Sequence, residues 1–250
     1  MKSVWLALLS VGFLWAQSFD VASVKPAANG TPFLMSPLTG GKFTAHNVDA
    51  WSLVRAAYRV LDYQISGAPN WLQTERYDID AKSDQPADAA QTRLMLQSLL
   101  ADRFHVKIRL EQKEMHVLAL TAGKSIKLTP ADATGCDLDP IPANPCGNLR
   151  RSAGFVVTGE RVTMAQFAVM LSALFRQAVK DETGLTGVFD FKLDLVAAGF
   201  TPTAPSPSSE MDGMNAVMSG LQDQLGLKLE RTRSTVEMLV IEHVERPSAN

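Results

Sequence analysis

The sequence predicts an α+β fold made of two copies of one β-α-β-β-α-β-β unit, with helices packed on mostly antiparallel sheets. Two observations support this prediction. Apolar residues recur at helical spacing in some segments and alternate with polar residues in the segments between them. The pattern of the first half also returns in the second half. Amphipathic helices that alternate with half-buried strands are typical of helices covering one face of an antiparallel sheet.

The clearest copy of the pattern spans residues 162–195. Thr163 and Gln166 form a capping-box sequence, and the apolar residues that follow have the spacing of a helix with one buried face. A short strand then leads to a turn that contains Gly184 and Gly187. Residues 188–195 alternate between apolar and charged side chains, which predicts a strand with one buried face.

The first half follows the same order. A helix is expected after the N-cap Asp49, and a second helix is expected to bury leucines up to Phe104. The last two strands, joined by the polar residues 111–114, are expected to form a hairpin. The strands predicted in this half lie at 19–24, 42–48, 64–67, 77–81, 106–110 and 115–121.

A nearly constant shift relates the two halves. A shift of 114 residues pairs the helix start at Asp49 with that at Thr163, and a shift of 121 pairs Leu100 with Leu221. The shift grows because a Pro- and Ser-rich linker insertion at 198–213 lengthens the second copy. The predicted organisation is a signal peptide at 1–16, a first repeat at 17–130, a linker at 131–152 and a second repeat at 153–250.

The N-terminus predicts export. Residues 1–16 contain one early lysine, an apolar run and Ala16 at the end, which is typical of a secretory signal peptide. An uncleaved anchor is the alternative, although the run is shorter than the roughly 20 apolar residues of a membrane span. We therefore expect a periplasmic or secreted protein with no membrane span after removal of the signal. The formal net charge of −2 gives no general attraction to nucleic acid.

The two cysteines fit an oxidising compartment. Cys136 and Cys146 lie in the predicted linker, and a disulfide between them is expected in an exported protein. The alternative, a metal site, would need further ligands. The four histidines do not provide these ligands, because no two of them have i, i+4 spacing. The sequence therefore predicts no metal and no cofactor.

Catalytic motifs are absent from the sequence. There is no GxSxG, no SxxK, no Walker loop and no GxGxxG. Two strands carry paired carboxylates, Asp78 with Asp80 and Asp190 with Asp194, which a glycosidase could use and which a solvated strand face also explains. Asp78 and Asp190 recur at a shift of 112, which favours a structural role such as accepting from turn N–H groups. No catalytic residue is predicted.

A ligand groove is the one binding site that the residue types suggest. Tyr63, Trp71 and Arg76 surround the predicted turn at 67–69, and an aromatic side chain beside an arginine is typical of ligand grooves. The alternative is that Trp71 closes the end of a small core.

Seven segments along the mature chain carry a family resemblance. They are FDVASVKP, KFTAHNV, YQISGAPNWLQTERYDIDAK, LMLQSLLADRF, VKDETGLTGVFDFKL, LQDQLGLKLE and VEMLVIEHVERP. Together they resemble the soil-associated exported protein family, a domain of unknown function that is expanded in acidobacteria and fused in some members to membrane metallopeptidases of the BlaR type. The resemblance implies export. It supplies no catalytic residues, because the family carries no established activity.

Three functions follow as expectations. The first is a non-catalytic binding or interaction protein of the cell envelope, whose partner is an unknown envelope protein or polymer. The second is a secreted hydrolase of envelope or extracellular polymers, which would need a cleft with two carboxyl groups, one with a raised pKa. The third is a sensor-type ligand domain detached from a membrane partner.

Overall fold

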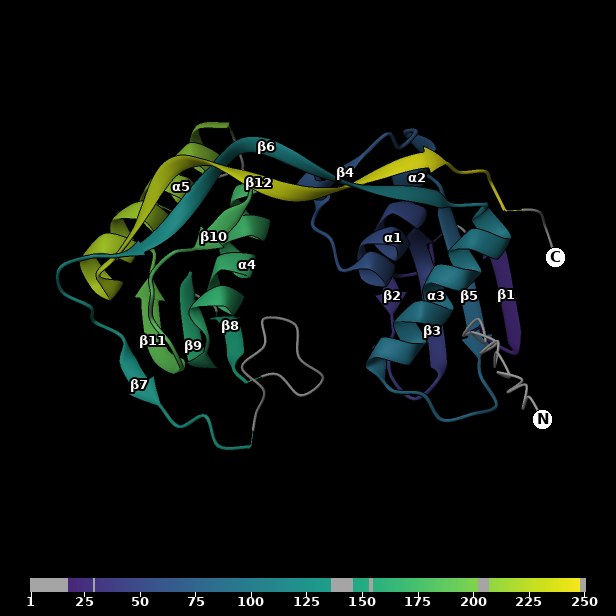
Figure 1. The fold of residues 1–250 in the computed structure, drawn as a ribbon, viewed down its shortest axis with the longest axis horizontal. Coiled ribbons are helices and arrows are strands. Elements are labelled where there is room, and N and C mark those ends of the chain that lie inside the picture. The colour runs from purple at the N-terminus through teal and green to yellow at the C-terminus, as the bar shows by residue number, and fades with distance from the viewer. Residues whose placement is uncertain (1–17, 29, 136–145, 153–154, 202–206, 248–250) are drawn as a thin grey trace, which may run out of the picture. The chain divides into compact units, whose positions relative to one another are not determined.

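The computed structural model describes residues 18–28, 30–135, 146–152, 155–201 and 207–247 (Figure 1). These residues form helices and three four-stranded sheets, which confirms the predicted α+β class. The chain divides into two compact units. The first unit comprises Met1–Arg59, Pro69–Lys107 and His243–Asn250, and the second comprises Val60–Ala68 and Ile108–Glu242.

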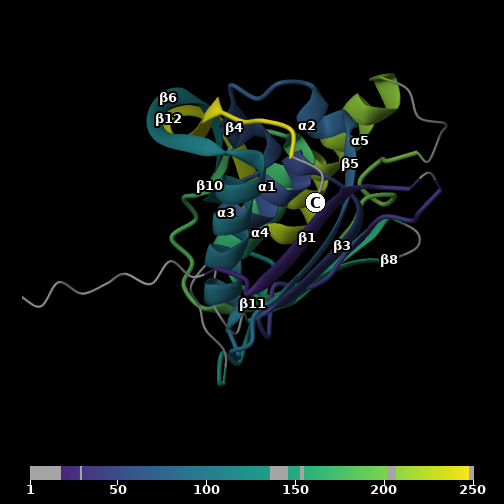
Figure 2. The ribbon, with the colours of Figure 1, turned by 90° about the vertical axis from the view of Figure 1, so that its right-hand side faces the viewer.

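The first unit is an antiparallel sheet with strand order β1-β5-β3-β2. Helices α1 and α3 lie on one side of this sheet (Figure 2). The core between them consists of side chains less than 2% exposed, including Phe43, Leu53, Ile79, Leu96 and Phe104. The elements are β1 (Val21–Pro26), β2 (Leu34–Met35), β3 (Lys42–Asp49), α1 (Ala50–Tyr58), α2 (Trp71–Thr74), β5 (Arg76–Lys82) and α3 (Ala89–Phe104).

The second unit contains two sheets. The first sheet has the strand order β7-β11-β9-β8, and its neighbouring strands are antiparallel. The second sheet has the order β10-β6-β12-β4 and includes the parallel pairs β10–β6 and β4–β12. The strands are β4 (Ile65–Ser66), β6 (Lys107–Ala122), β7 (Thr129–Ala131), β8 (Asn148–Ser152), β9 (Val156–Val162), β10 (Val179–Asp181), β11 (Val188–Asp194) and β12 (Leu227–His243). The helices are the 3₁₀ turn η1 (Asp62–Gln64), α4 (Met164–Phe175), α5 (Pro207–Gly220) and the π-helical turn η2 (Leu221–Leu225).

The hairpin predicted at the end of each repeat is wrong, because a single long strand takes its place. β6 runs without interruption through residues 111–114, and β12 runs from Leu227 to His243. The segment 111–114 consists of Glu, Gln, Lys and Glu, and it lacks the Gly, Pro, Asn or Asp that tight turns require. These polar residues instead form an exposed stretch of strand. Each half therefore has the order β-α-β-β-α-β, and β6 and β12 are the two central strands of one sheet.

Two boundaries differ from those expected from the sequence. Helix α5 begins at Pro207, inside the predicted linker insertion 198–213. Proline suits the first position of a helix, where its missing N–H would have no partner within the helix. The compact units also cut across the predicted repeats, because residues 60–68 and 108–130 belong to the second unit although they fall in the first repeat.

The two antiparallel sheets share a local detail that involves the recurring aspartates. Asn47 in β3 and Arg161 in β9 both have positive φ, 51° and 55°, just before a helix. The backbone N–H of Asn47 donates to Asp78 Oδ1 at 2.9 Å, and that of Arg161 donates to Asp190 Oδ1 at 2.7 Å. In each sheet the strand is irregular at this residue, so its N–H does not bond to the neighbouring strand. The carboxylate accepts a hydrogen bond from this N–H instead. The geometry agrees with the structural role predicted for these two aspartates.

The three tyrosines give a prediction for alkaline pH. Burial raises the pKa of Tyr58, Tyr63 and Tyr77, and Tyr77 is 4% exposed and donates to Glu75 Oε2 at 2.9 Å. Because the pKa of each tyrosine is higher in the folded state than in the unfolded state, its contribution to the free energy of unfolding is fully present below about pH 10, the pKa of an unfolded tyrosine. This contribution is lost as the pH rises above that value. We expect the free energy of unfolding to fall above about pH 10, and the fall to be smaller in Tyr77→Phe. Urea unfolding across this range tests the expectation, and phenolate absorbance at about pH 10 in the folded protein would contradict it.

Candidate functional site

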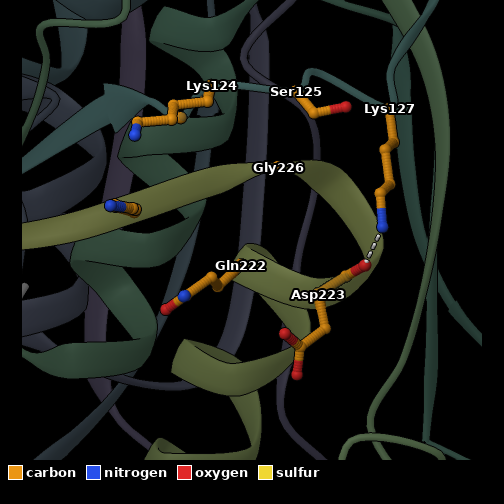
Figure 3. A pocket seen from close by; sticks show the side chains of 8 residues that line it. Lys124, Ser125, Lys127, Gln222, Asp223 and Gly226 are labelled. Carbon is orange, nitrogen blue, oxygen red and sulfur yellow. Dashed lines mark hydrogen bonds between the residues drawn. The ribbon is translucent and has the colours of Figure 1, made fainter.

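A pocket of about 550 Å³ opens in the second unit (Figure 3). It lies between the loop that follows β6 and the segment that joins η2 to β12. Its volume falls within the roughly 300–1,000 Å³ of small-molecule sites. The lining residues are Gly123, Lys124, Ser125, Lys127, Gln222, Asp223, Gly226 and Lys228.

Three hydrogen bonds hold the loop against η2. The backbone N–H of Gly123 donates to the carbonyl of Gly226 at 2.8 Å, and that of Lys127 donates to the carbonyl of Leu225 at 3.0 Å. The Lys127 ammonium group donates to the backbone carbonyl of Asp223 at 2.6 Å (Figure 3). Lys127 therefore positions the loop and also satisfies a carbonyl of the π turn.

Gly226 is required where the loop crosses η2. It ends the turn in the left-handed conformation, with φ 71°, and its N–H donates to the carbonyl of Leu221. A Cβ atom at this position would overlap the carbonyl oxygen of Ser125. Only glycine combines this backbone angle with so close an approach of the loop.

The charges of the pocket favour an anion. Its side chains include three lysines and one carboxylate, that of Asp223, which accepts from the Ser219 hydroxyl at 3.0 Å and points away from Lys127 (Figure 3). Lys124 and Lys228 are exposed, and within the described part of the chain their ammonium groups have no hydrogen-bond or ion-pair partner. Two ammonium groups are thus available to a carboxylate, phosphate or sulfate group of a ligand.

The π turn distinguishes this pocket from the corresponding place in the first unit. At the shift of 121 residues, Leu221–Leu225 corresponds to residues 100–104, which form the regular end of α3. Single π turns widen a helix locally, and they occur frequently at functional sites. Here the π turn contributes Gln222 and Asp223 to the lining.

This pocket was not predicted from the sequence. The signals were available, since two lysines follow Gly123 within four residues and Lys228 follows Gly226 by two. However, about 100 residues separate the two segments, so only the hydrogen bonds between loop and turn show that they form one site.

The structure places the three residues of the predicted groove as follows. In the first unit the Arg246 guanidinium lies 5.2 Å from the Trp71 ring centroid, and its Nη2 donates to Glu75 Oε1 at 2.7 Å. Arg76 pairs with Asp49 and lines a pocket of about 360 Å³. Tyr63 belongs to the second unit, where it packs against the cluster of Val117, Ala178, Val236 and Met238. The groove stays a prediction.

Acid–base chemistry of the hydrolase type requires a carboxyl group with a raised pKa in a cleft. Among the described residues, two carboxyl groups have a displaced pKa, and the pKa of both Glu75 and Asp132 is lowered, chiefly by hydrogen bonds from Arg246 and Thr134. Asp20 and Asp102 line one pocket, but it measures about 120 Å³, below the size of ordinary ligand sites. Among the described residues, no group of three or more His, Cys, Asp or Glu could hold a metal ion.

Two predictions concern residues outside the described ranges. Cys146 is 2% exposed, but its predicted partner Cys136 lies outside the described residues, so the disulfide stays a prediction. The predicted signal peptide at 1–16 also lies outside them. In the described part of the chain, no helix combines the length and apolar character needed to cross a membrane.

Comparison with known proteins identifies a family. Residues 51–244 match the model of a family described as a protein of unknown function (DUF3738). No curated protein and no solved structure matches the chain.

Proposed function

The chain belongs to this family of proteins of unknown function, and we propose that it is an exported, non-catalytic binding protein of the cell envelope that recognises anionic groups on a polymer. The lysine-lined pocket would bind the anionic group, with Lys124 and Lys228 contacting it and Lys127 holding the loop in place. The predicted export signal, the family resemblance and the absence of catalytic motifs from the sequence support this proposal.

One observation carries it. Two ammonium groups without a partner among the described residues line the same preformed pocket, next to the polar side chains of Ser125 and Gln222. The chain as a whole has a net charge of −2, so attraction to an anion must come from a local group of lysines. Screening limits such attraction to about 10 Å at 0.1 M salt. A polymer with many anionic groups suits a site of this kind, because each single contact is weak.

Two alternatives remain open. A hydrolase would turn over the polymer that it binds, and Asp223 is the one carboxylate in the lining of this pocket. A sensor-type ligand domain would bind a small anion through the same lysines and would act through a partner protein. Measuring product formation distinguishes the hydrolase from a binding protein. Comparing a polymer with its monomer distinguishes the sensor-type domain from a polymer-binding protein.

We also infer that the two halves descend from one duplicated unit. The sheet orders β1-β5-β3-β2 and β7-β11-β9-β8 correspond strand by strand, and the aspartate-bonded turns before α1 and α4 correspond residue by residue. On this inference the lysine pocket is a feature gained by the second copy.

The test is binding of the mature chain, residues 17–250, to polygalacturonate, with neutral dextran and galacturonic acid as comparisons. We expect saturable binding to polygalacturonate, weaker binding to the monomer and none to dextran. The double variant Lys124→Gln/Lys228→Gln should weaken binding about tenfold, because each exposed charge contact contributes about 0.2–1 kcal/mol. Release of reducing ends during incubation would support the hydrolase instead.

A matched control uses two lysines of the first unit. Lys42 and Lys82 are exposed and face each other as register partners on β3 and β5. The variant Lys42→Gln/Lys82→Gln removes the same charge and should change affinity less than about twofold. Equal losses in both double variants would contradict the proposed site, because they would show attraction to the surface as a whole.

A further inference from the structure

An apolar groove of about 420 Å³ forms a second concave site in the second unit. Its base is made of buried side chains, and its borders include Leu174, which is 44% exposed. Helices α4 and α5 and strands β8, β9 and β11 all contribute to it. The lining residues are Arg151, Val157, Met170, Leu171, Ala173, Leu174, Arg176, Leu193, Leu195 and Val217.

The polar side chains of the lining are two arginines. Arg151 comes from β8, and Arg176 is the left-handed residue, with φ 50°, that ends α4. Both are exposed, and in the described part of the chain neither guanidinium has a hydrogen-bond or ion-pair partner. No acidic residue belongs to the lining. The groove therefore combines an apolar interior with a positive charge that planar carboxylates match well.

Helix α5, which borders the groove through Val217, carries smaller side chains than the corresponding helix of the first unit. In the first unit, the buried face of α3 carries Met95, Leu96 and Leu99. At the shift of 121 residues, the corresponding positions of α5 are Ala216, Val217 and Gly220. A Cβ atom on Gly220 would lie 2.6 Å from Leu193 Cδ1, so a larger residue at this position would require Leu193 to move.

The corresponding helix pair of the first unit is tied together. The amide of Gln97 in α3 donates to the backbone carbonyl of Ala57 in α1 at 2.8 Å. In the second unit, the residue that corresponds to Gln97 is Met218, which is 40% exposed. The second unit thus carries an unfilled groove where the first has larger core side chains and a polar link between its helices.

We propose that this groove binds a single-chain fatty acid, with the carboxylate at Arg151 and Arg176 and the acyl chain along the apolar base. Charge and shape both select this ligand. Unlike a carboxylate, an uncharged chain could not pair with the two exposed arginines, and a fully polar anion would leave the apolar surface in water. The proposal is independent of the lysine pocket, which shares no residue with the groove.

The test is titration of the mature chain with a dansylated undecanoic acid, followed by displacement with palmitate and with hexadecanol. We expect saturable fluorescence enhancement and tighter binding of palmitate than of hexadecanol. Arg151→Gln/Arg176→Gln should weaken palmitate binding about tenfold and leave hexadecanol binding unchanged. The matched control, Arg150→Gln/Arg233→Gln, removes the same charge from exposed positions outside the lining and should leave both affinities unchanged.

A second pair of variants tests the apolar part. Ala173 is exposed and lines the groove, so Ala173→Trp should fill it and weaken palmitate binding more than tenfold. Val169 is 46% exposed on the same helix and outside the lining, so Val169→Trp should have no effect. Circular dichroism would establish that each variant is folded, and the arginine variants decide the question if Ala173→Trp is not.

Three results would overturn the proposal. The first is the absence of saturable binding by the folded wild-type chain. The second is equal affinity for palmitate and hexadecanol in the wild type and in the arginine variant. The third is undiminished binding in a folded Ala173→Trp variant, which would place the acyl chain elsewhere.

Discussion

Gly226→Ala should lower the free energy of unfolding by about 2–4 kcal/mol and should also weaken polygalacturonate binding. Two costs combine at this position. An alanine would have to adopt φ 71°, and its Cβ atom would overlap the carbonyl oxygen of Ser125. Relief of the overlap moves the loop away from η2 and breaks the bond from Gly123 to Gly226. Because Lys124 lies in this loop, its ammonium group would leave the position where it faces the ligand.

Gly184→Ala is the matched control for this prediction. Gly184 also has positive φ, 68°, but no atom lies within 4 Å of the place where its Cβ would be. We expect this variant to lose only about 1 kcal/mol and to retain polymer binding. Urea unfolding and the binding titration would be run on both variants. Equal stability losses would contradict the close approach of loop and turn on which the pocket depends.

Phe167→Ala should destabilise the second unit by about 3–5 kcal/mol, the largest loss expected from a single core residue. Phe167 lies on α4, is 0% exposed, and contacts the Phe191 ring at a centroid distance of 4.7 Å. Its removal leaves a cavity between helix and sheet and also removes an aromatic pair worth about 0.5–1.5 kcal/mol. Urea unfolding followed by circular dichroism measures the loss, because Trp51 and Trp71 both lie in the first unit and would not report on the second.

The control for this variant lies on the same helix. Val169 is 46% exposed, and Val169→Ala replaces a β-branched residue by the best helix former. We expect a change of less than about 0.5 kcal/mol. If Phe167→Ala were as mild as this control, the packing of α4 on β11 described above would be incorrect.

The parts of the fold that depend on local signals were predictable from the sequence. Asp49 accepts from the backbone N–H of Ser52 at 2.7 Å, and Thr163 accepts from that of Gln166 at 3.1 Å, so both predicted caps begin their helices. A cap is a property of four adjacent residues, which explains why it can be recognised without the rest of the chain.

The parts that depend on distant pairing were not predictable. Residues 111–114 have the polarity of a turn, and only their place in a long central strand shows that they are extended. The lysine pocket likewise depends on hydrogen bonds between residues 123–127 and 225–226. The apolar groove is an intermediate case. The shift of 121 residues shows that α5 has smaller side chains than α3, but only the structure shows that Val217 lines a groove together with residues of α4 and the sheet.

The most direct test of the central claim is an amide NMR titration of the mature chain with polygalacturonate at about 50 mM and about 500 mM salt. We expect saturable chemical-shift changes concentrated at Lys124, Ser125, Lys127 and Lys228, and loss of these changes at the higher salt, where charges interact only within about 4 Å. Shifts spread evenly over the lysines of both units, or shifts confined to other residues, would contradict the lysine pocket as the binding site.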